Sequence, residues 1–222
     1  MKIDLHCHTY YSRDALCPPR RLVRFAKKRG LDAIAITDHD TTRAWKEAEE
    51  EAGKIGLKII RGEEIKIKES GKTIGEILAY FISKEIDPKG KTAAEVIEEI
   101  KNQGGLAIIA HPYHWKKPFR KLKECKSLAD GVEVFNARSQ SKKGNEKSLK
   151  FAEDNDLSMT AGSDSHTPLE IGRAYVEADI ERIEDLKEAI RDKKIVIRGK
   201  QTNPTIQIFA GLAKLIHIFY RP

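Results

Sequence analysis

The chain has 222 residues, of which 40% are hydrophobic and 34% charged, a composition that suits one globular domain and excludes a fibrous or disordered protein. Its three cysteines, Cys7, Cys17 and Cys125, are odd in number and form no Cys-x-x-Cys pair. This argues against a disulfide framework and against a cysteine-based zinc site. No signal-peptide pattern follows Met1, so we expect a cytoplasmic protein.

The net charge is +7 at pH 7, and much of the basic excess is concentrated in one part of the chain. Between residues 116 and 126 a single acidic residue, Glu124, opposes six basic ones: Lys116, Lys117, Arg120, Lys121, Lys123 and Lys126. Clustered positive charge attracts and steers anions, so the run favours an anionic partner such as a phosphorylated small molecule or a nucleic acid. A merely solvated basic face explains the same run equally well.

Short apolar segments alternate with helical segments along the first half of the chain. Residues 3–8 are predicted to form a buried strand. Pro18 and Pro19 open a helix that ends at Gly30, because proline suits a first helical turn and glycine the position after the last. Further strands are expected over 32–37, 57–60 and 77–82, with a helix over 43–54 and a hairpin turn at Ser70 and Gly71.

The second half continues the alternation. Thr92 and Glu95 form a capping box, which predicts a helix ending at Gly104 and Gly105. Strands are expected over 106–110, 131–135, 157–161, 173–177 and 195–197, with helices through 149–152 and 183–190. Strands and helices in this order predict a parallel sheet with helices outside, closed into a β/α barrel whose strands end at one common mouth.

Polar side chains follow these predicted strands where each strand ends. On the first strand, Asp4, His6 and His8 are expected to share one face, with Leu5 and Cys7 on the other, because strand side chains alternate. Five of the seven histidines lie at strand ends, together with two carboxylates; the set is His6, His8, His39, Glu63, His111, Asp164 and His166. Mixed imidazole and carboxylate groups at one mouth predict a site for divalent metal ions.

The same motifs resemble, in order and spacing, those of the PHP (polymerase and histidinol phosphatase) superfamily. They are Asp4-Leu5-His6-Cys7-His8, Thr37-Asp38-His39-Asp40-Thr41, Gly62-Glu63, His111-Pro112 and Ser163-Asp164-Ser165-His166. The resemblance covers about residues 1–178. It implies a distorted seven-stranded, TIM-like β/α barrel with two or three divalent metal ions (Mn, Fe or Zn) at its C-terminal face. The second motif looks more like the small nucleotide phosphatase branch than the histidinol phosphatase branch.

The resemblance also implies roles for individual residues. One metal would be held by His6, His8, Glu63 and Asp164, a second by Asp14, His39 and His166, and a third by Glu63 and His111. The family usually has a histidine where this chain has Glu76, so Glu76 is the expected remaining ligand. The expected catalytic residues are Asp164, His166, Glu63 and His39. Asp4 and Asp38 are expected to orient histidines, and Arg138 and Arg173 to bind phosphate.

The implied activity is that of a metal-dependent phosphatase that hydrolyses nucleotides or related small phosphomonoesters by attack of a metal-bridging hydroxide. A nuclease or nucleic-acid end-processing enzyme is one alternative, favoured by the basic run. A non-catalytic RNA- or protein-binding barrel is another, disfavoured by the nearly complete ligand set.

Residues 1–203 are expected to form the phosphoesterase domain. Residues 204–222 are expected to form an apolar helix, too short to span a bilayer. This helix would pack on the barrel or on a second copy of the chain, so a homo-oligomer is one expected outcome.

Overall fold

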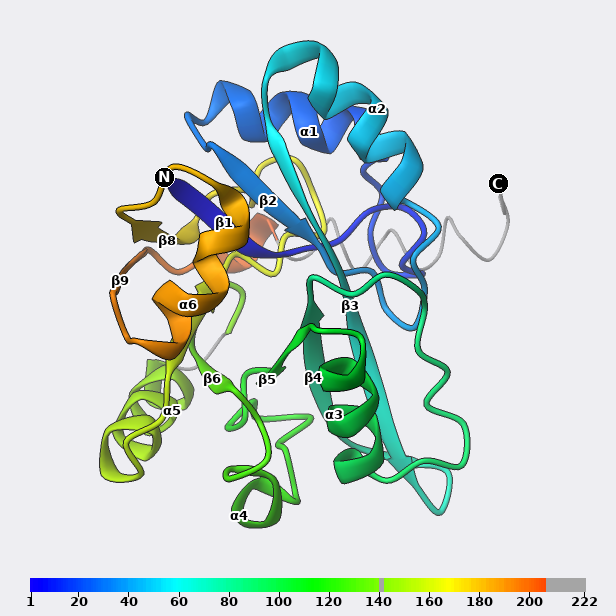
Figure 1. Cartoon of the computed structure of the whole chain (residues 1–222), viewed down its shortest axis with the longest axis vertical. Helices are drawn as coiled ribbons and strands as arrows, with labels where there is room; N and C mark the ends of the chain where they lie inside the picture. The colour runs from blue at the N-terminus through cyan, green and yellow to red at the C-terminus, as the bar shows by residue number, and fades with distance from the viewer. Residues whose placement is uncertain (140–141, 207–222) are drawn as a thin grey trace.

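The computed structural model describes residues 1–139 and 142–206, and Figure 1 shows how their elements are arranged. The strands are β1 Lys2–Cys7, β2 Ala33–Ile36, β3 Lys58–Glu69, β4 Lys72–Tyr80, β5 Leu106–Ile109, β6 Gly131–Asn136, β7 Met159–Gly162, β8 Ala174–Ala178 and β9 Ile195–Gly199. The helices are α1 Pro19–Lys28, α2 Trp45–Ile55, α3 Ala93–Asn102, α4 Leu122–Cys125, α5 Lys142–Asp154 and α6 Leu186–Arg191, with a 3-10 turn, η1, at Ile183–Asp185.

The sheet is barrel-shaped and nearly closed, as expected, but within the described residues it contains nine strands rather than seven. Its order is β7-β6-β5-β4-β3-β2-β1-β8-β9. Ser165, just after β7, returns to β1: its carbonyl accepts a hydrogen bond from His8 N (2.9 Å) and its amide donates one to His6 O (3.3 Å). Strands β1 to β7 therefore form the barrel, and β8 and β9 extend the sheet beyond β1.

The expectation of a wholly parallel sheet is wrong for two strands. Strand β4 runs antiparallel to β3 and β5, and β8 runs antiparallel to β1 and β9. The predicted hairpin explains β4, because Ser70 and Gly71 have φ values of 48° and 75°, which a two-residue turn requires. A parallel neighbour would instead need a crossover of a dozen or more residues.

Two hydrophobic clusters lie on the two faces of this sheet. One fills the barrel interior with side chains such as Ile60 and Leu78 and continues to α6. The other lies between the sheet and helices α1, α2 and α3 and includes Ile36, Ile65 and Ile67. Membership of one or the other cluster therefore shows which way a strand side chain points.

The helices begin and end close to the predicted positions. Thr92 and Glu95 form the expected capping box at the start of α3, and Gly30, with φ 76°, follows α1. No helix in 1–139 or 142–206 is long and apolar enough to cross a membrane. The predicted helix over 204–222 falls largely on residues 207–222, which lie outside the described part of the chain.

Candidate metal centre

Strand β1 carries His6, and His8 follows it directly, but the side chains of the strand do not simply alternate between its two faces. Leu5 belongs to the interior cluster and Cys7 to the helix-facing one, so the expectation that they share a face is wrong. The cause is a register shift between Asp4 and Cys7 in the pairing of β1 with β2, as a β-bulge produces. His6 and His8 nevertheless lie together, with their Nε2 atoms 3.0 Å apart.

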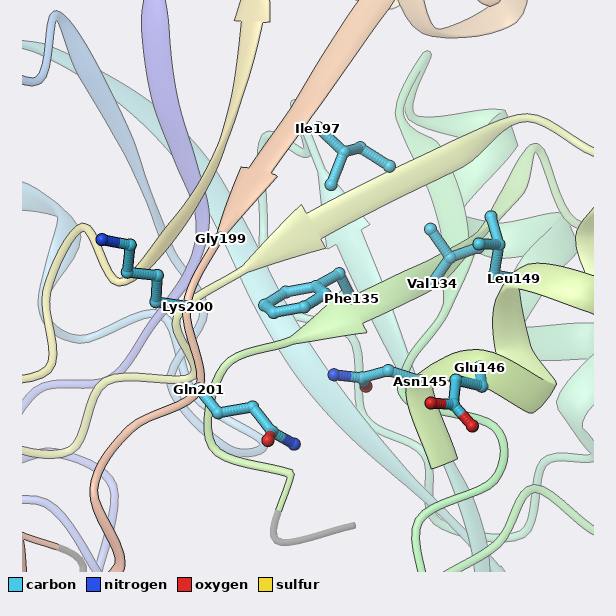
Figure 2. A pocket seen from close by; sticks show the side chains of 9 residues that line it. All are labelled: Val134, Phe135, Asn145, Glu146, Leu149, Ile197, Gly199, Lys200 and Gln201. Carbon is cyan, nitrogen blue, oxygen red and sulfur yellow. The ribbon is translucent and has the colours of Figure 1, made fainter. Parts of the chain in front are cut away.

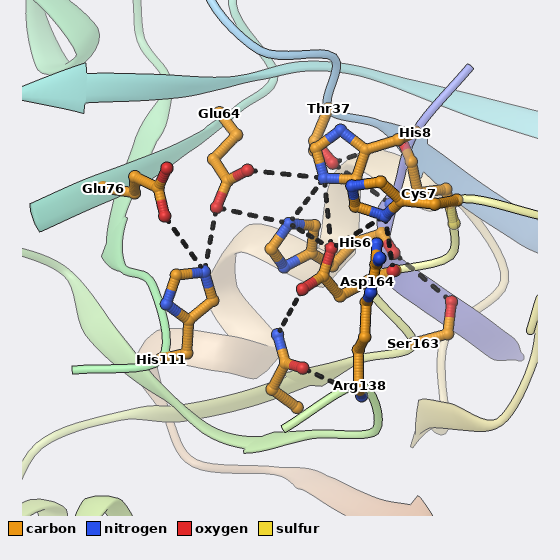
Figure 3. Close-up of polar contacts among 12 residues, drawn as sticks. His6, Cys7, His8, Thr37, Glu64, Glu76, His111, Arg138, Ser163 and Asp164 are labelled. Atoms are coloured by element: carbon orange, nitrogen blue, oxygen red, sulfur yellow. Dashed lines mark hydrogen bonds and ion pairs between the residues drawn. The ribbon is translucent and has the colours of Figure 1, made fainter. Parts of the chain in front are cut away.

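The carboxylate of Glu64 lies at the centre of a group of four histidines, three of which Figure 3 labels. Its Oε1 is 3.4 Å from His6 Nε2 and 3.0 Å from His111 Nε2. Its Oε2 is 3.3 Å from His8 Nε2 and 2.9 Å from His39 Nδ1. One buried carboxylate on β3 is thus within reach of imidazoles from β1 and from the segments that follow β1, β2 and β5.

Glu63, the expected ligand and catalytic residue, points away from this group. Alternate side chains of β3 face opposite sides of the sheet. Glu63 therefore faces the helices, as Ile65 and Ile67 do, whereas Glu64 faces the barrel interior, as Ile60 does. Glu63 Oε2 accepts a hydrogen bond from Ile86 N (3.0 Å), and burial raises its pKa to about 8. The prediction that Glu63 joins the histidines is therefore wrong, and Glu64 occupies that place.

The segment after β7 and the loop after β1 complete the group. Asp164 Oδ1 is 3.3 Å from His8 Nε2. Asp14 Oδ1 is 3.4 Å from His166 Nε2 and 3.7 Å from His39 Nε2. Apart from Glu63, the structure brings together every residue predicted to bind metal, with Glu64 in addition.

Two members of this group are held in a strained backbone conformation. Asp164 has a φ of 52° and His111 a φ of 23°, values that side chains other than glycine rarely adopt. Such strain persists where the surrounding structure fixes the residue, and it concentrates at functional sites.

Glu76 reaches the group from β4, on the interior face of that strand. Its Oε2 is 3.5 Å from His111 Nε2, and its Oε1 is 3.0 Å from Lys117 Nζ. In the sequence Lys117 was one member of a basic run, and nothing in its pattern indicated this contact.

Buried groups behind the histidines fix their orientation. Glu133 Oε1 is 2.9 Å from His6 Nδ1, and Glu133 Oε2 accepts hydrogen bonds from the His111 amide and from Asn136 Nδ2, both 3.1 Å long. Holding Nδ1 of His6 directs its Nε2 toward Glu64. Sequence reasoning missed Glu133, although a glutamate inside the apolar strand β6 was a usable signal.

The two aspartates expected to orient histidines act in different ways. Asp38 accepts a hydrogen bond from Ser12 Oγ (2.7 Å), and that oxygen lies 3.0 Å from His8 Nδ1. Asp38 therefore orients His8 through Ser12. Among the described residues, Asp4 bonds to no imidazole ring. It accepts hydrogen bonds from the backbone amides of His6, Ser163 and Gly172 and so ties β1 to the segments after β7.

Opposite charges stabilise one another in this buried group. Burial disfavours the ionised form of Glu64, but the attraction of the nearby His6 and His39 imidazoles is stronger than this effect. It holds the Glu64 pKa well below its usual range. Burial opposes protonation of His39, yet Glu64 and Asp14 raise its pKa to about 10. His111 follows the same pattern, with a pKa of about 9.

The donor set fits divalent metal ions. Four carboxylates, those of Asp14, Glu64, Glu76 and Asp164, are packed among imidazoles, so the group needs positive charge at its centre. Imidazole nitrogen and carboxylate oxygen without thiolate are the donors that Mn²⁺, Fe²⁺ and Zn²⁺ accept. Nitrogen and oxygen atoms of several triplets lie within 4.8 Å of one another, among them those of His8, His39 and His166 and those of His6, His8 and Glu64.

The group forms the floor of a cavity of about 200 Å³. His114, Trp115, Lys116, Lys117 and Arg138 line it in addition to the acidic and imidazole groups. Arg138 therefore lies where a phosphate-binding residue was expected, whereas Arg173 is not among the residues that line the cavity.

A larger cavity of about 450 Å³ lies between β6, α5 and β9 (Figure 2). Its lining is mostly apolar, with Val134, Phe135 and Ile197 among its members and no histidine. The candidate chemistry therefore belongs to the smaller cavity.

Comparison with known proteins agrees with this geometry, since residues 4–197 match the PHP domain family. The chain belongs to the PHP family. Over 155 residues it is 41% identical to an uncharacterized protein of Methanocaldococcus jannaschii. This alignment covers 62% of this chain and 82% of that relative. This PHP chain is also 26% identical over 198 residues to the “Probable phosphatase” of Acetivibrio thermocellus, covering 77% and 82% of the two chains.

Solved structures support the same fold. A “putative metal-dependent phosphoesterase” from Bifidobacterium adolescentis aligns with a TM-score of 0.62 and 25% identity, covering 74% of this chain and 87% of that one. PsfC from Pseudomonas syringae aligns with a TM-score of 0.72 and 16% identity over 96% and 97% of the two chains, and that likeness shows the fold alone.

Proposed function

We propose that this PHP protein is a metal-dependent phosphatase that hydrolyses phosphomonoesters of nucleotides or related small molecules. The observation that carries the proposal is the buried Glu64 carboxylate within 3.4 Å of four imidazoles, under a cavity with Lys117 and Arg138 in its wall. The floor suits divalent cations and the wall suits a phosphate group. The likeness to a “Probable phosphatase” and to a metal-dependent phosphoesterase supports the same chemistry.

Two neighbouring sets of side chains would hold the metal ions. One set is His6, His8, Glu64 and Asp164, and the other is Asp14, His39 and His166. When bound, such ions acidify water and neutralise charge on phosphoryl oxygens. Manganese, iron and zinc all suit these donors.

Other side chains of the cavity would bind and position the substrate. Arg138 would donate hydrogen bonds to phosphate oxygens, because a guanidinium matches them in a forked geometry. His114 is not suited to protonate a leaving group at neutral pH, because burial and nearby His111 lower its pKa to about 4. The leaving oxygen would then take its proton from water.

Trp115 favours nucleotides among the phosphomonoesters. It lines the cavity, its side chain is 57% exposed, and Lys116 Nζ lies 4.4 Å from the ring centre on one side. A nucleobase stacks on an exposed aromatic ring, which is worth about 1–3 kcal/mol per base. We therefore expect faster turnover of nucleotides than of sugar phosphates that lack a base.

The test is phosphate release from a panel of nucleotides and other phosphomonoesters, with and without Mn²⁺. Wild type is compared with Asp164→Asn, which keeps the shape of the side chain but removes its charge. Turnover that requires metal and disappears in the variant would support the proposal. No turnover by protein shown to contain metal would refute it.

A nuclease remains the second candidate because Lys116 and Lys117 line the cavity. Other members of the basic run are engaged elsewhere: Lys121 pairs with Glu69 and Glu124, and Lys126 contacts Asn155. The basic surface at the cavity is therefore short, which favours single nucleotides or strand ends over long nucleic acid. Salt-sensitive cleavage of oligonucleotides would support the nuclease instead.

The remaining expectations stay predictions. Every predicted ligand except Glu63 lies in the group, and Glu64 takes its place, which disfavours a non-catalytic binding barrel. A cytoplasmic location, and a homo-oligomer formed through residues 204–222, are not tested by the described residues.

A further inference from the structure

The two oxygens of Glu76 have different partners. Oε2 faces the histidines, 3.5 Å from His111 Nε2, whereas Oε1 receives the ammonium group of Lys117 at 3.0 Å. Glu76 is 2% exposed, so its charge requires a positive partner. Lys117 supplies that charge from the loop between β5 and α4.

Lys117 is directed into the group of carboxylates. Its Nζ lies 3.0 Å from Glu76 Oε1, and its side chain lines the cavity together with Glu64 and Asp14. The ammonium therefore lies on the Glu76 side of the cavity.

The loop that carries Lys117 is attached to the strand that carries Glu76. Phe119 is 4% exposed, and its ring covers Gly75 so closely that a Cβ atom there would lie 2.3 Å from the ring. The Arg120 amide donates a 2.7 Å hydrogen bond to Ile74 O. The amide of Lys117 itself donates to His114 Nδ1 at 3.2 Å. The ion pair is thus built into the fold rather than made by a free surface side chain.

We propose that the Lys117 ammonium takes the place of a third metal ion, so that the centre binds two divalent ions rather than three. This inference deepens the proposed metal-dependent function and rests on it. An ion held by His111 and by Oε2 of Glu76 would share that carboxylate with the Lys117 ammonium on Oε1, and the two cations would repel each other at close range. A fixed positive charge remains in the cavity wall, where it faces the incoming phosphate.

The test measures metal content rather than activity. Protein is dialysed to equilibrium against one fixed concentration of free Mn²⁺, and the bound metal per chain is determined by elemental analysis. The variants are Lys117→Met, which keeps the length of the side chain and removes its charge, and the double variant Lys117→Met/Glu76→Gln. Lys116→Met is the matched control, because Lys116 lines the same cavity but lies over Trp115.

We expect two ions per chain in wild type and in Lys116→Met. Lys117→Met is expected to bind a third ion, and the double variant to bind two again because the freed carboxylate has been removed. The Lys117 side chain is 43% exposed, so its replacement is compatible with folding, which circular dichroism checks. A wild-type content other than two ions, or an unchanged content in Lys117→Met, would overturn the inference. A wild-type content of zero would also refute the metal-dependent function itself.

Discussion

The adjacent residues Glu63 and Glu64 are expected to respond to the same substitution in opposite ways. Glu63 is fully buried beneath the helix-facing side of β3, and its pKa is about 8 instead of 4.5. At neutral pH it therefore keeps its proton in the folded chain and loses it in the unfolded chain. Glu63→Gln preserves the shape and can accept the same hydrogen bond from Ile86 N, but it does not titrate.

The raised pKa of Glu63 determines how the free energy of unfolding changes with pH. Because the folded state binds the extra proton between pH 4.5 and 8, its stability falls as pH rises through that range. The fall is about 1.4 kcal/mol per pH unit, or about 3 kcal/mol between pH 5 and 7.5. Glu63→Gln removes this contribution, whereas all other titrating groups are common to both proteins and cancel in the comparison.

Urea unfolding of wild type and Glu63→Gln at pH 5, 6.5 and 7.5 measures this difference. We expect Glu63→Gln to gain stability over wild type as pH rises and to retain its bound metal. Glu64→Gln is the matched control and is expected to lose metal, because Glu64 contacts four imidazoles. Parallel pH profiles for wild type and Glu63→Gln, or loss of metal in Glu63→Gln, would refute the assignment of the two residues.

Three further outcomes are expected. Glu133→Gln should weaken metal binding by about 10–100-fold in a competition titration, because Glu133 orients His6; an unchanged affinity would contradict that role. Gly75→Ala should lower the unfolding free energy by about 1–3 kcal/mol, because a Cβ would lie 2.3 Å from the Phe119 ring, and a neutral result in urea unfolding would argue against this packing. Metal-free protein should lose stability as pH rises from about 6.5 to between 9 and 10, because over that range the folded state holds protons on His111 and His39 that the unfolded state has released; a melting temperature that stays flat over that range would count against the charged cluster.

The sequence was sufficient for the barrel and for most of the site, because both depend on local patterns. A polar residue directly after a short apolar strand lies at the mouth of a barrel whatever the details of its packing. His39, His111 and Asp164 follow this rule and lie together as predicted. The nine-residue strand β4 also begins at the hairpin that Ser70 and Gly71 indicated.

The errors have a common physical origin in strand register. The third strand was expected to end at residue 60, but it continues to Glu69 because it pairs with β4 along the hairpin. Because Ile65 and Ile67 belong to this longer strand and face the helices, Glu64 faces the barrel interior. The contact of Lys117 with Glu76 depends on a loop docking on a distant strand, which no local pattern encodes.

The candidate metal centre lies across the line where the barrel closes. His6 lies on β1 and His8 directly after it, Asp164 and His166 follow β7, and the backbone of Ser165 pairs with that of His6 and His8 between the two sides. Gly162 allows this approach, since a Cβ atom there would lie 2.2 Å from the Cβ of His6. Ions bound between these residues would link the two sides and stabilise the closed barrel. Removal of bound metal should therefore speed amide hydrogen exchange first at His8 and Ser165.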